Sequence, residues 1–203
     1  MKCYILNTYK KASGGAFLPQ NSADPLPIVH IDQEDRFSCA PICVKMVLNY
    51  VSQDLGINIP NLDLNDIRRI VRTQADGTLP YDVARINQKL RPASHRVEFI
   101  PSEGNSFHDI EEELEGKRPV IAWILKTVDN IGFYHAVVIT HVDKDRLIVG
   151  YDDPMFGKQE YPVPSFLNDW EECENNLLIR LSIDRKPPQK ELEDFPHDLN
   201  AGK

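Results

Sequence analysis

The hydrophobic pattern of the chain changes from helical to strand-like near residue 116. Before that point, apolar residues such as Val44, Val47 and Val51 recur three or four positions apart, which predicts amphipathic helices. After it, short apolar runs rich in β-branched residues predict strands. Helices followed by a run of antiparallel strands favour an α+β fold with an N-terminal helical half and a C-terminal sheet half. We expect any chemistry in a cleft between the halves.

Turn and capping signals give the expected boundaries. A proline at position 41 suits the first turn of a helix, and Asp63 can cap the next one. The predicted helices are 41–52, a second that stops at Asp76-Gly77, a third from about Thr78 that ends before Pro92, and the shorter 106–116 and 165–172. The predicted strands are 95–101, 119–125, 134–142, 146–151, 158–163 and 176–183, with Asp143-Lys-Asp145 closing a hairpin.

Composition narrows the class of protein. The 203 residues favour one compact domain, and 41% hydrophobic with 27% charged residues is ordinary for a globular chain. A net charge of -8 and a pI of about 5.2 argue against binding to nucleic acid or to an anionic membrane. We read Arg68-Arg69 as a solvated helix face. The sequence predicts neither a signal peptide nor a transmembrane segment, so a cytoplasmic location is expected, and secretion by a route without a cleavable signal stays open.

Cys39 is the cysteine whose surroundings predict reactivity. It lies where a polar loop becomes the first helix, so unpaired backbone N–H groups and the positive end of the helix dipole face it. The pKa of a thiol falls at such a position and beside an imidazolium. Cys3, Cys43 and Cys173 are interpreted as small buried hydrophobic residues. The cysteine spacing predicts neither a zinc site nor a disulfide framework.

Three further residue types complete the side chains that a thiol hydrolase needs. His135, at the start of an apolar strand, could exchange a proton with the thiol, and His141 is the competing histidine. Asp152 or Asp153, at the end of the next strand, could orient the imidazole. Gln33 could donate to an oxyanion together with the cysteine's own backbone N–H.

These residues resemble the C39 group of papain-like cysteine peptidases, best known as the leader-cleaving part of bacteriocin-exporting ABC transporters. The resemblance covers residues 27–183. It rests on Gln33-x5-Cys39-x-Pro41, on His135 in an apolar strand, and on Asp153-Pro154-x-x-Gly157. Similar secondary features are Met46-Val-Leu-Asn-Tyr50, Asp76-Gly77-Thr78, Pro119-Val-Ile121, and Phe166 with Trp170.

The resemblance implies a papain-like fold, a peptide or protein substrate, and no cofactor or metal. It implies Cys39 as nucleophile, His135 as base, Asp153 as orienting carboxylate and Gln33 as oxyanion donor. We expect an N-terminal segment over 1–26, the peptidase domain over 27–183 and a flexible tail over 184–203. With no transporter domain in the sequence, a stand-alone enzyme is expected.

Three functions stay open at this stage. The first is a peptidase or amide hydrolase that forms an acyl-thioester on Cys39. The second is an acyl or peptidyl transferase on the same fold, in which an amine or thiol replaces water. The third is a peptide-binding module without catalysis, which Ala40 favours because this group usually has glycine after the cysteine. Ser38 also departs from the group, in which aspartate is common there. The sequence leaves the oligomeric state open.

Overall fold

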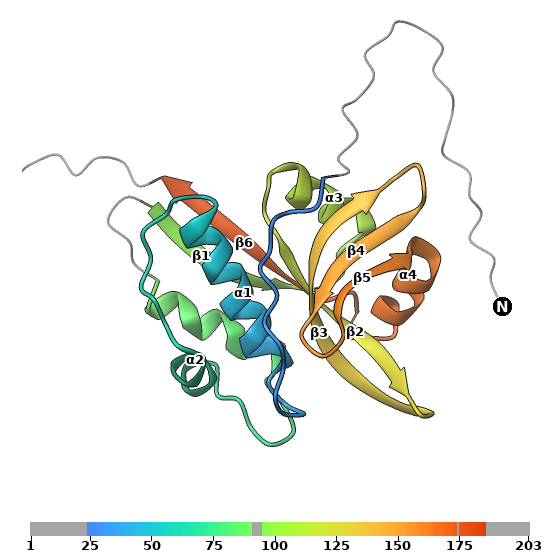
Figure 1. The fold of residues 1–203 in the computed structure, drawn as a ribbon, viewed down its shortest axis with the longest axis horizontal. Coiled ribbons are helices and arrows are strands. Elements are labelled where there is room, and N and C mark those ends of the chain that lie inside the picture. Colours follow the sequence, from blue (N-terminus) through green and yellow to red (C-terminus); the bar gives the residue numbers. More distant parts are fainter. Residues whose placement is uncertain (1–23, 91–94, 174, 186–203) are drawn as a thin grey trace, which may run out of the picture.

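Within the described residues, a six-stranded antiparallel sheet and five helices form the fold, whose arrangement is seen in Figure 1. The computed structural model describes residues 24–90, 95–173 and 175–185. The strand order is β1-β6-β2-β3-β4-β5. The helices are α1 (Cys39–Gln53), α2 (Leu64–Ile70), η1 (Pro80–Gln88), α3 (Phe107–Glu115) and α4 (Val163–Glu171). The strands are β1 (His95–Ser102), β2 (Val120–Val128), β3 (Ile131–Asp143), β4 (Ile148–Asp153), β5 (Gly157–Pro162) and β6 (Leu178–Arg185).

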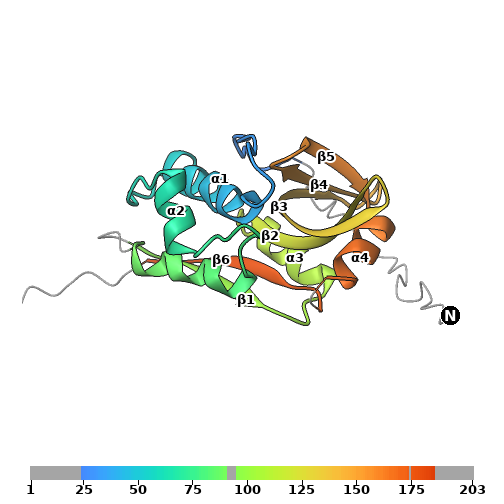
Figure 2. The same cartoon turned by 90° about the horizontal axis from the view of Figure 1, so that it is seen from below.

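Helices cover both faces of the sheet because the central strands are apolar on both sides. In β2, Ile121 and Trp123 belong to the core cluster of α1, α2 and η1, whereas Val120 and Ala122 belong to the cluster of α3 and α4. This alternation follows from the two-residue period of a strand. Figure 2 shows α1 and α2 on one side of the strands and α3 and α4 on the other. The expected α+β class is confirmed.

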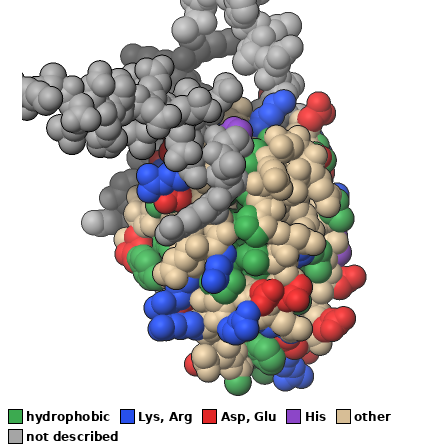
Figure 3. Space-filling model, turned by 90° about the vertical axis from the view of Figure 1, so that its left-hand side faces the viewer, with side chains coloured by type: hydrophobic (Ala, Val, Ile, Leu, Met, Phe, Trp, Pro, Cys, Tyr) green, Lys and Arg blue, Asp and Glu red, His purple; other side chains and the backbone are tan. Residues whose placement is uncertain are grey.

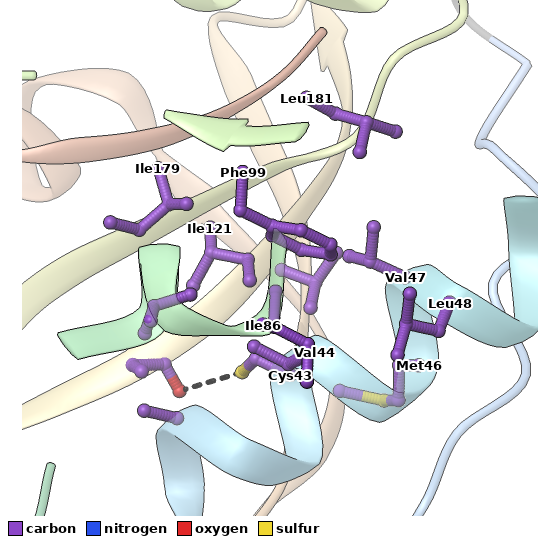
Figure 4. Packing of buried hydrophobic residues seen from close by; sticks show 14 of the residues in the cluster. Cys43, Val44, Met46, Val47, Leu48, Ile86, Phe99, Ile121, Ile179 and Leu181 are labelled. Carbon is purple, nitrogen blue, oxygen red and sulfur yellow. Dashed lines mark hydrogen bonds between the residues drawn. The ribbon is translucent and has the colours of Figure 1, made fainter. Parts of the chain in front are cut away.

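The first core fixes α1 against the sheet. Val44 and Val47 of α1 are fully buried and pack with Phe99 and Ile121 of the strands (Figure 4). One residue before Val44, the Cys43 thiol donates a hydrogen bond to the Ala136 carbonyl at 3.3 Å. The helix is therefore held at a defined height over β3, which also fixes where its first residue lies.

Local signals in the sequence explain most element boundaries. The side chain of Asp63 caps α2 by accepting from the Asp66 backbone N–H, as the spacing predicts. Ser106 and Asp109 form the expected capping box of α3. The predicted hairpin at Asp143-Lys-Asp145 is also confirmed, since β3 and β4 pair antiparallel there.

Four elements differ clearly from the expectation. The second helix, α2, ends at Ile70 instead of continuing to the predicted stop at Asp76-Gly77. The third helix, η1, is a 3-10 helix, a geometry that is uncommon at this length. The strands β2 and β3 extend further toward each other than predicted and meet in a two-residue turn at Asp129 and Asn130, with φ of 50° and 63°. Positive φ at both central positions is typical of a type I′ hairpin turn, which Asp and Asn tolerate.

The segment that precedes α1 follows the boundary between the helical half and the sheet. We call residues 25–37 the entry segment; it lies between α1 and the strands β3 and β4 (dark blue in Figure 1). The Leu26 backbone N–H donates to the Thr140 carbonyl at 3.0 Å, and that of Gln33 donates to the Pro154 carbonyl at 2.7 Å. Two backbone hydrogen bonds therefore attach the entry segment to the sheet. Cys3 and most of the predicted N-terminal segment and tail lie outside the described residues.

The described surface carries charges of both signs. On the face shown in Figure 3, Lys and Arg side chains are interspersed with Asp and Glu, and hydrophobic side chains occupy small separate areas. The net charge of -8 does not form a single acidic patch on that face. Among the described residues, no helix is both long and apolar enough to cross a membrane.

Candidate active site

Cys39 is the first residue of α1, and the helix N-terminus around it has no side-chain cap. The N-cap residue is Ser38, whose hydroxyl instead donates to Asp35 at 2.8 Å. The first turn contains no acidic residue, and Pro41 has no N–H to offer. Backbone N–H groups and the positive end of the dipole therefore remain available to negative charge at the Cys39 thiol or beside it.

His135 lies between Cys39 and Asp153 and is a hydrogen-bond partner of both. Its Nε2 lies 2.7 Å from Asp153 Oδ1, which leaves Nδ1 for the sulfur. Burial alone would lower the pKa of His135, but hydrogen bonds to the two partners and their negative charges outweigh it and raise the pKa to about 9. At neutral pH the arrangement favours an imidazolium here, although the side chain is only 2% exposed.

Asp153 is buried and held by three donors on one oxygen. Oδ1 accepts from His135 and from the backbone N–H groups of Met155 and Phe156, at 2.9 and 3.2 Å for the latter two. Burial would raise the pKa of Asp153, but the His135 hydrogen bond and charge and the Met155 N–H outweigh it and hold the pKa below its usual range. The residues after β4 thus fix Asp153 as a carboxylate.

The alternative carboxylate, Asp152, binds a different histidine. Its Oδ1 lies 2.5 Å from His30 Nδ1 in the entry segment, and the other His30 nitrogen lies 3.0 Å from Asp32. Burial would lower the pKa of His30, but hydrogen bonds to the two carboxylates outweigh it and raise the pKa. Asp152 and Asp153 therefore bind two different histidines, His30 and His135, on opposite sides of the sheet.

The competing histidine, His141, does not join the cluster. Its ring packs against the backbone of Gly150, where a methyl group would meet the ring at 1.8 Å. Burial lowers the pKa of His141, which is the shift expected for a neutral, desolvated imidazole. Of the two candidates, the structure places only His135 beside Cys39.

Gln33 lies in the entry segment with its amide held in place. Its Nε2 donates to the Asp35 carbonyl at 2.5 Å, and its own backbone N–H is bound by Pro154. An amide nitrogen carries two protons, so one remains for an oxyanion. The side-chain oxygen, Oε1, is buried without a hydrogen-bond partner in the described chain.

A salt bridge that the sequence analysis missed supports the loop before Cys39. Arg68 of α2 donates to Asp35 at 2.6 Å and to the Ser38 hydroxyl at 2.9 Å. Reading Arg68-Arg69 as a solvated face is therefore wrong for Arg68, whose side chain is 27% exposed, and holds for Arg69, which is 79% exposed. Because the two residues are separated by 100° around a helix, neighbours in sequence can face different surroundings.

A cleft of about 370 Å³ opens beside Cys39. Its walls are Trp123 and Tyr134 of the sheet half and residues of the 72–82 segment, including the exposed Leu79. Ala40 is instead 1% exposed and packs in the first core, so its methyl group points away from this space. In the described part of the chain, no group of three His, Cys, Asp or Glu residues could hold a metal ion.

The other described cysteines differ from Cys39. Cys43 and Cys173 are fully buried, which confirms their interpretation as core residues. Burial raises the pKa of the Cys43 thiol well above its ordinary value. Cys39 alone among the three is partly accessible.

The fold is of the class found in C39-like, papain-like peptidases. The model of the Peptidase_C39 like family matches residues 25–177, and the chain belongs to that family. The resemblance stated from the sequence is thereby confirmed.

Solved structures agree on the fold. A double glycine motif protease from an AMS/PCAT transporter, in complex with a leader peptide, has a TM-score of 0.54 at 16% identity, covering 82% of this chain and 97% of its own. A C39-like peptidase from Bacillus anthracis has a TM-score of 0.56 at 12% identity, covering 77% of this chain and 95% of its own. No curated protein matches the sequence.

Proposed function

We propose that this protein is a cysteine peptidase that cleaves peptide bonds through an acyl-thioester on Cys39. The observation that carries the proposal is the placement of His135, which is hydrogen-bonded to both Cys39 and Asp153. A histidine whose raised pKa favours the imidazolium supports a neighbouring thiolate, which is the nucleophilic form of cysteine. Family membership supports the same reaction class.

In the first half-reaction, the Cys39 thiolate attacks the carbonyl carbon of the scissile peptide bond. The carbonyl oxygen becomes an oxyanion, which the Gln33 amide and the Cys39 backbone N–H stabilise by hydrogen bonds. His135 then donates its proton to the leaving amine as the C–N bond breaks. The products are a free amine and an acyl group held as a thioester.

In the second half-reaction, neutral His135 takes a proton from a water molecule that attacks the thioester. The tetrahedral intermediate collapses, the C–S bond breaks, and the carboxylic product leaves. The Cys39 thiolate and the imidazolium are restored together. Throughout, Asp153 keeps the ring oriented through its hydrogen bond to Nε2.

The cleft beside Cys39 supports a peptide as substrate. Its volume of about 370 Å³ is suited to a few residues of an extended chain, and Trp123, Leu79 and Tyr134 offer apolar contacts on two sides. The structural neighbour that holds a leader peptide binds its ligand on the same fold. The burial of the Ala40 methyl in the core keeps it out of the cleft, which supports catalysis over a binding module without catalysis.

Replacement of the nucleophile tests the proposal. We expect Cys39→Ala to lower cleavage of a peptide library, followed by mass spectrometry, by roughly 1,000-fold or more, because both half-reactions need the sulfur. Labelling by a thiol-directed probe should also disappear from the peptide that contains residue 39.

Cys43→Ala is the matched control, because it removes a thiol one helical turn away. Cys43 is buried and bound to Ala136, so this variant should lose some stability and keep its activity per folded molecule. Cleavage that survives in Cys39→Ala, or that vanishes equally in both folded variants, contradicts the proposal.

A further inference from the structure

Lys126 of β2 places an ammonium group against the outer oxygen of Asp153. The Nζ atom lies 3.3 Å from Oδ2, while His135 and two backbone N–H groups occupy Oδ1. Oδ2 is otherwise without a hydrogen-bond partner in the described chain and is buried. A buried carboxylate oxygen needs compensation for lost hydration, and Lys126 is the group that supplies it here.

The strand register aims Lys126 and His135 at the same side of the sheet. Lys126 is paired with Phe133, and Phe133 lies two residues before His135 on β3. Paired residues and residues two apart share a face, so the ammonium and imidazole groups are diagonal neighbours. The Phe133 and His135 rings confirm this, since they meet edge to face with centroids 5.9 Å apart.

Three other contacts fix the ammonium group. Nζ donates to the Tyr151 hydroxyl at 3.1 Å and lies 5.3 Å from the ring centroids of Tyr151 and Phe156. The side chain is 19% exposed, so its charge is screened less than that of a surface lysine. Burial alone would lower the pKa of Lys126, but the Tyr151 hydrogen bond and the Asp153 charge outweigh it and raise the pKa.

We propose that Lys126 is a positioning residue that fixes the outer oxygen of Asp153 and sets the pH range in which the Cys39–His135 pair is charged. This inference rests on the proposed function, because it concerns the same cluster. With Lys126 in place, the two negative groups, Cys39 and Asp153, are balanced by two positive ones. Without Lys126 the cluster would carry one more negative charge. Protons would then dissociate from the thiol and the imidazolium at a higher pH.

Other titratable groups around the cluster do not replace this cation. The neighbouring groups are Cys43 of α1, Tyr134 of β3, Tyr151 and Asp152 of β4, Lys158 and Tyr161 of β5, Asp169 of α4, and His30 of the entry segment. His30 is bound by Asp152 on the other side of the sheet, and Lys158 lies opposite that same aspartate in the β4–β5 register rather than opposite Asp153. Among the described residues, Lys126 is therefore the cation that contacts Asp153 in addition to His135.

The test measures the rate at which iodoacetamide alkylates Cys39 as a function of pH, together with the histidine titration seen by NMR. In Lys126→Met we expect both midpoints, thiol deprotonation and His135 deprotonation, to move up by about one pH unit, a tenfold change in proton concentration. Lys126→Arg should keep both near wild type, because it restores the charge. A purely structural role of Lys126 would lower reactivity at every pH and leave the midpoints in place.

Two further variants keep the test decisive. Tyr151→Phe removes the hydroxyl that anchors Nζ and should move both midpoints in the same direction by less, which also serves if Lys126→Met fails to fold. Lys144→Met is the matched control, since Lys144 pairs with Glu111 and Glu115 on the surface and should shift nothing.

The outcomes separate the two proposals. Unshifted midpoints in folded Lys126→Met and Tyr151→Phe overturn the role of Lys126 and leave the peptidase proposal standing. If wild-type Cys39 is alkylated no faster than an ordinary exposed thiol at every pH, the peptidase proposal itself fails.

Discussion

At the scale of single residues, adjacent aspartates have separate partners because they point to opposite faces of a strand. Asp153 binds His135, and Asp152 binds His30. The register explains this, since Asp152 is paired with Val138 and Tyr151 with Ile139. Asp153 and Tyr151 therefore share the face of His135, four residues before Ile139, while Asp152 faces the entry segment.

This difference predicts unequal effects of two conservative substitutions. Asp153→Asn should lower kcat/KM by roughly 100-fold or more, because the amide cannot stabilise an imidazolium as a carboxylate does. Asp152→Asn should cost about tenfold at most, because its partner does not touch the thiol. Steady-state kinetics on a peptide found in the library screen measures both. Equal losses, or the larger loss in Asp152→Asn, would contradict the assignment of Asp153.

The family resemblance favoured Asp153, but residue order alone left Asp152 as an alternative to it. Residue order identifies a thiol, a histidine and an aspartate, yet only the register of β3 and β4 decides which aspartate faces His135. Lys126 was not predicted either. Its pairing with Phe133 depends on the strand register, which the tight turn at Asp129 and Asn130 sets. A lysine inside an apolar strand, followed by two residues that tolerate positive φ, is the signal that could have revealed it.

At the scale of elements, the entry segment attaches the chain just before Cys39 to the end of β4. His30 binds Asp152 at the end of β4, and three residues later the Gln33 backbone is bound by Pro154. Both bonds join one short stretch to the residues around Asp153. We therefore expect the His30–Asp152 pair to position the Gln33 amide rather than to take part in proton transfer.

A double-mutant cycle tests this positioning role. His30→Asn and Asp152→Asn should each lower kcat/KM by roughly tenfold, because a small displacement of an oxyanion donor is costly. The double variant should be no worse than either single one, since the two side chains act as one contact. Asp32→Asn, whose side chain is 91% exposed, is the control and should stay within about twofold. Losses that simply multiply in the double variant would contradict a shared role.

The sequence predicted features that depend on residues close together better than features that depend on residues far apart in the chain. The caps of α2 and α3 depend on residues three positions apart, and both are where the sequence predicts them. The Arg68–Asp35 ion pair joins residues 33 positions apart, and no local pattern announces it. The two-residue turn at Asp129 and Asn130 is also a local feature, but it was not predicted, so β2 and β3 were both predicted too short.

At the scale of the whole molecule, two hydrophobic cores hold the parts of the site in place. The first core fixes α1, and with it Cys39, while the second buries the other face of the strands β2, β3 and β4. The contact between Cys39 and His135 thus joins the helical half to the sheet half. Hydrophobic periodicity predicted the two halves. The distance between Cys39 and His135 depends on how the halves pack, which periodicity does not give.

The pH dependence of this contact follows from the sign of the His135 shift. Its pKa in the folded protein is raised from 6.5 to about 9. The stabilisation it contributes is therefore complete below about pH 6.5 and is lost as the pH rises through 9. His135 should therefore stay protonated at neutral pH.

The most direct measurement is an NMR titration of the His135 imidazole in wild type and in Cys39→Ala. We predict that His135 titrates near pH 9 in the wild-type protein, and that its pKa falls in Cys39→Ala, where the negative partner is gone while Asp153 remains. A His135 that titrates near 6.5 in both proteins would show that the thiol and the imidazole do not form a charged pair, and would contradict the account.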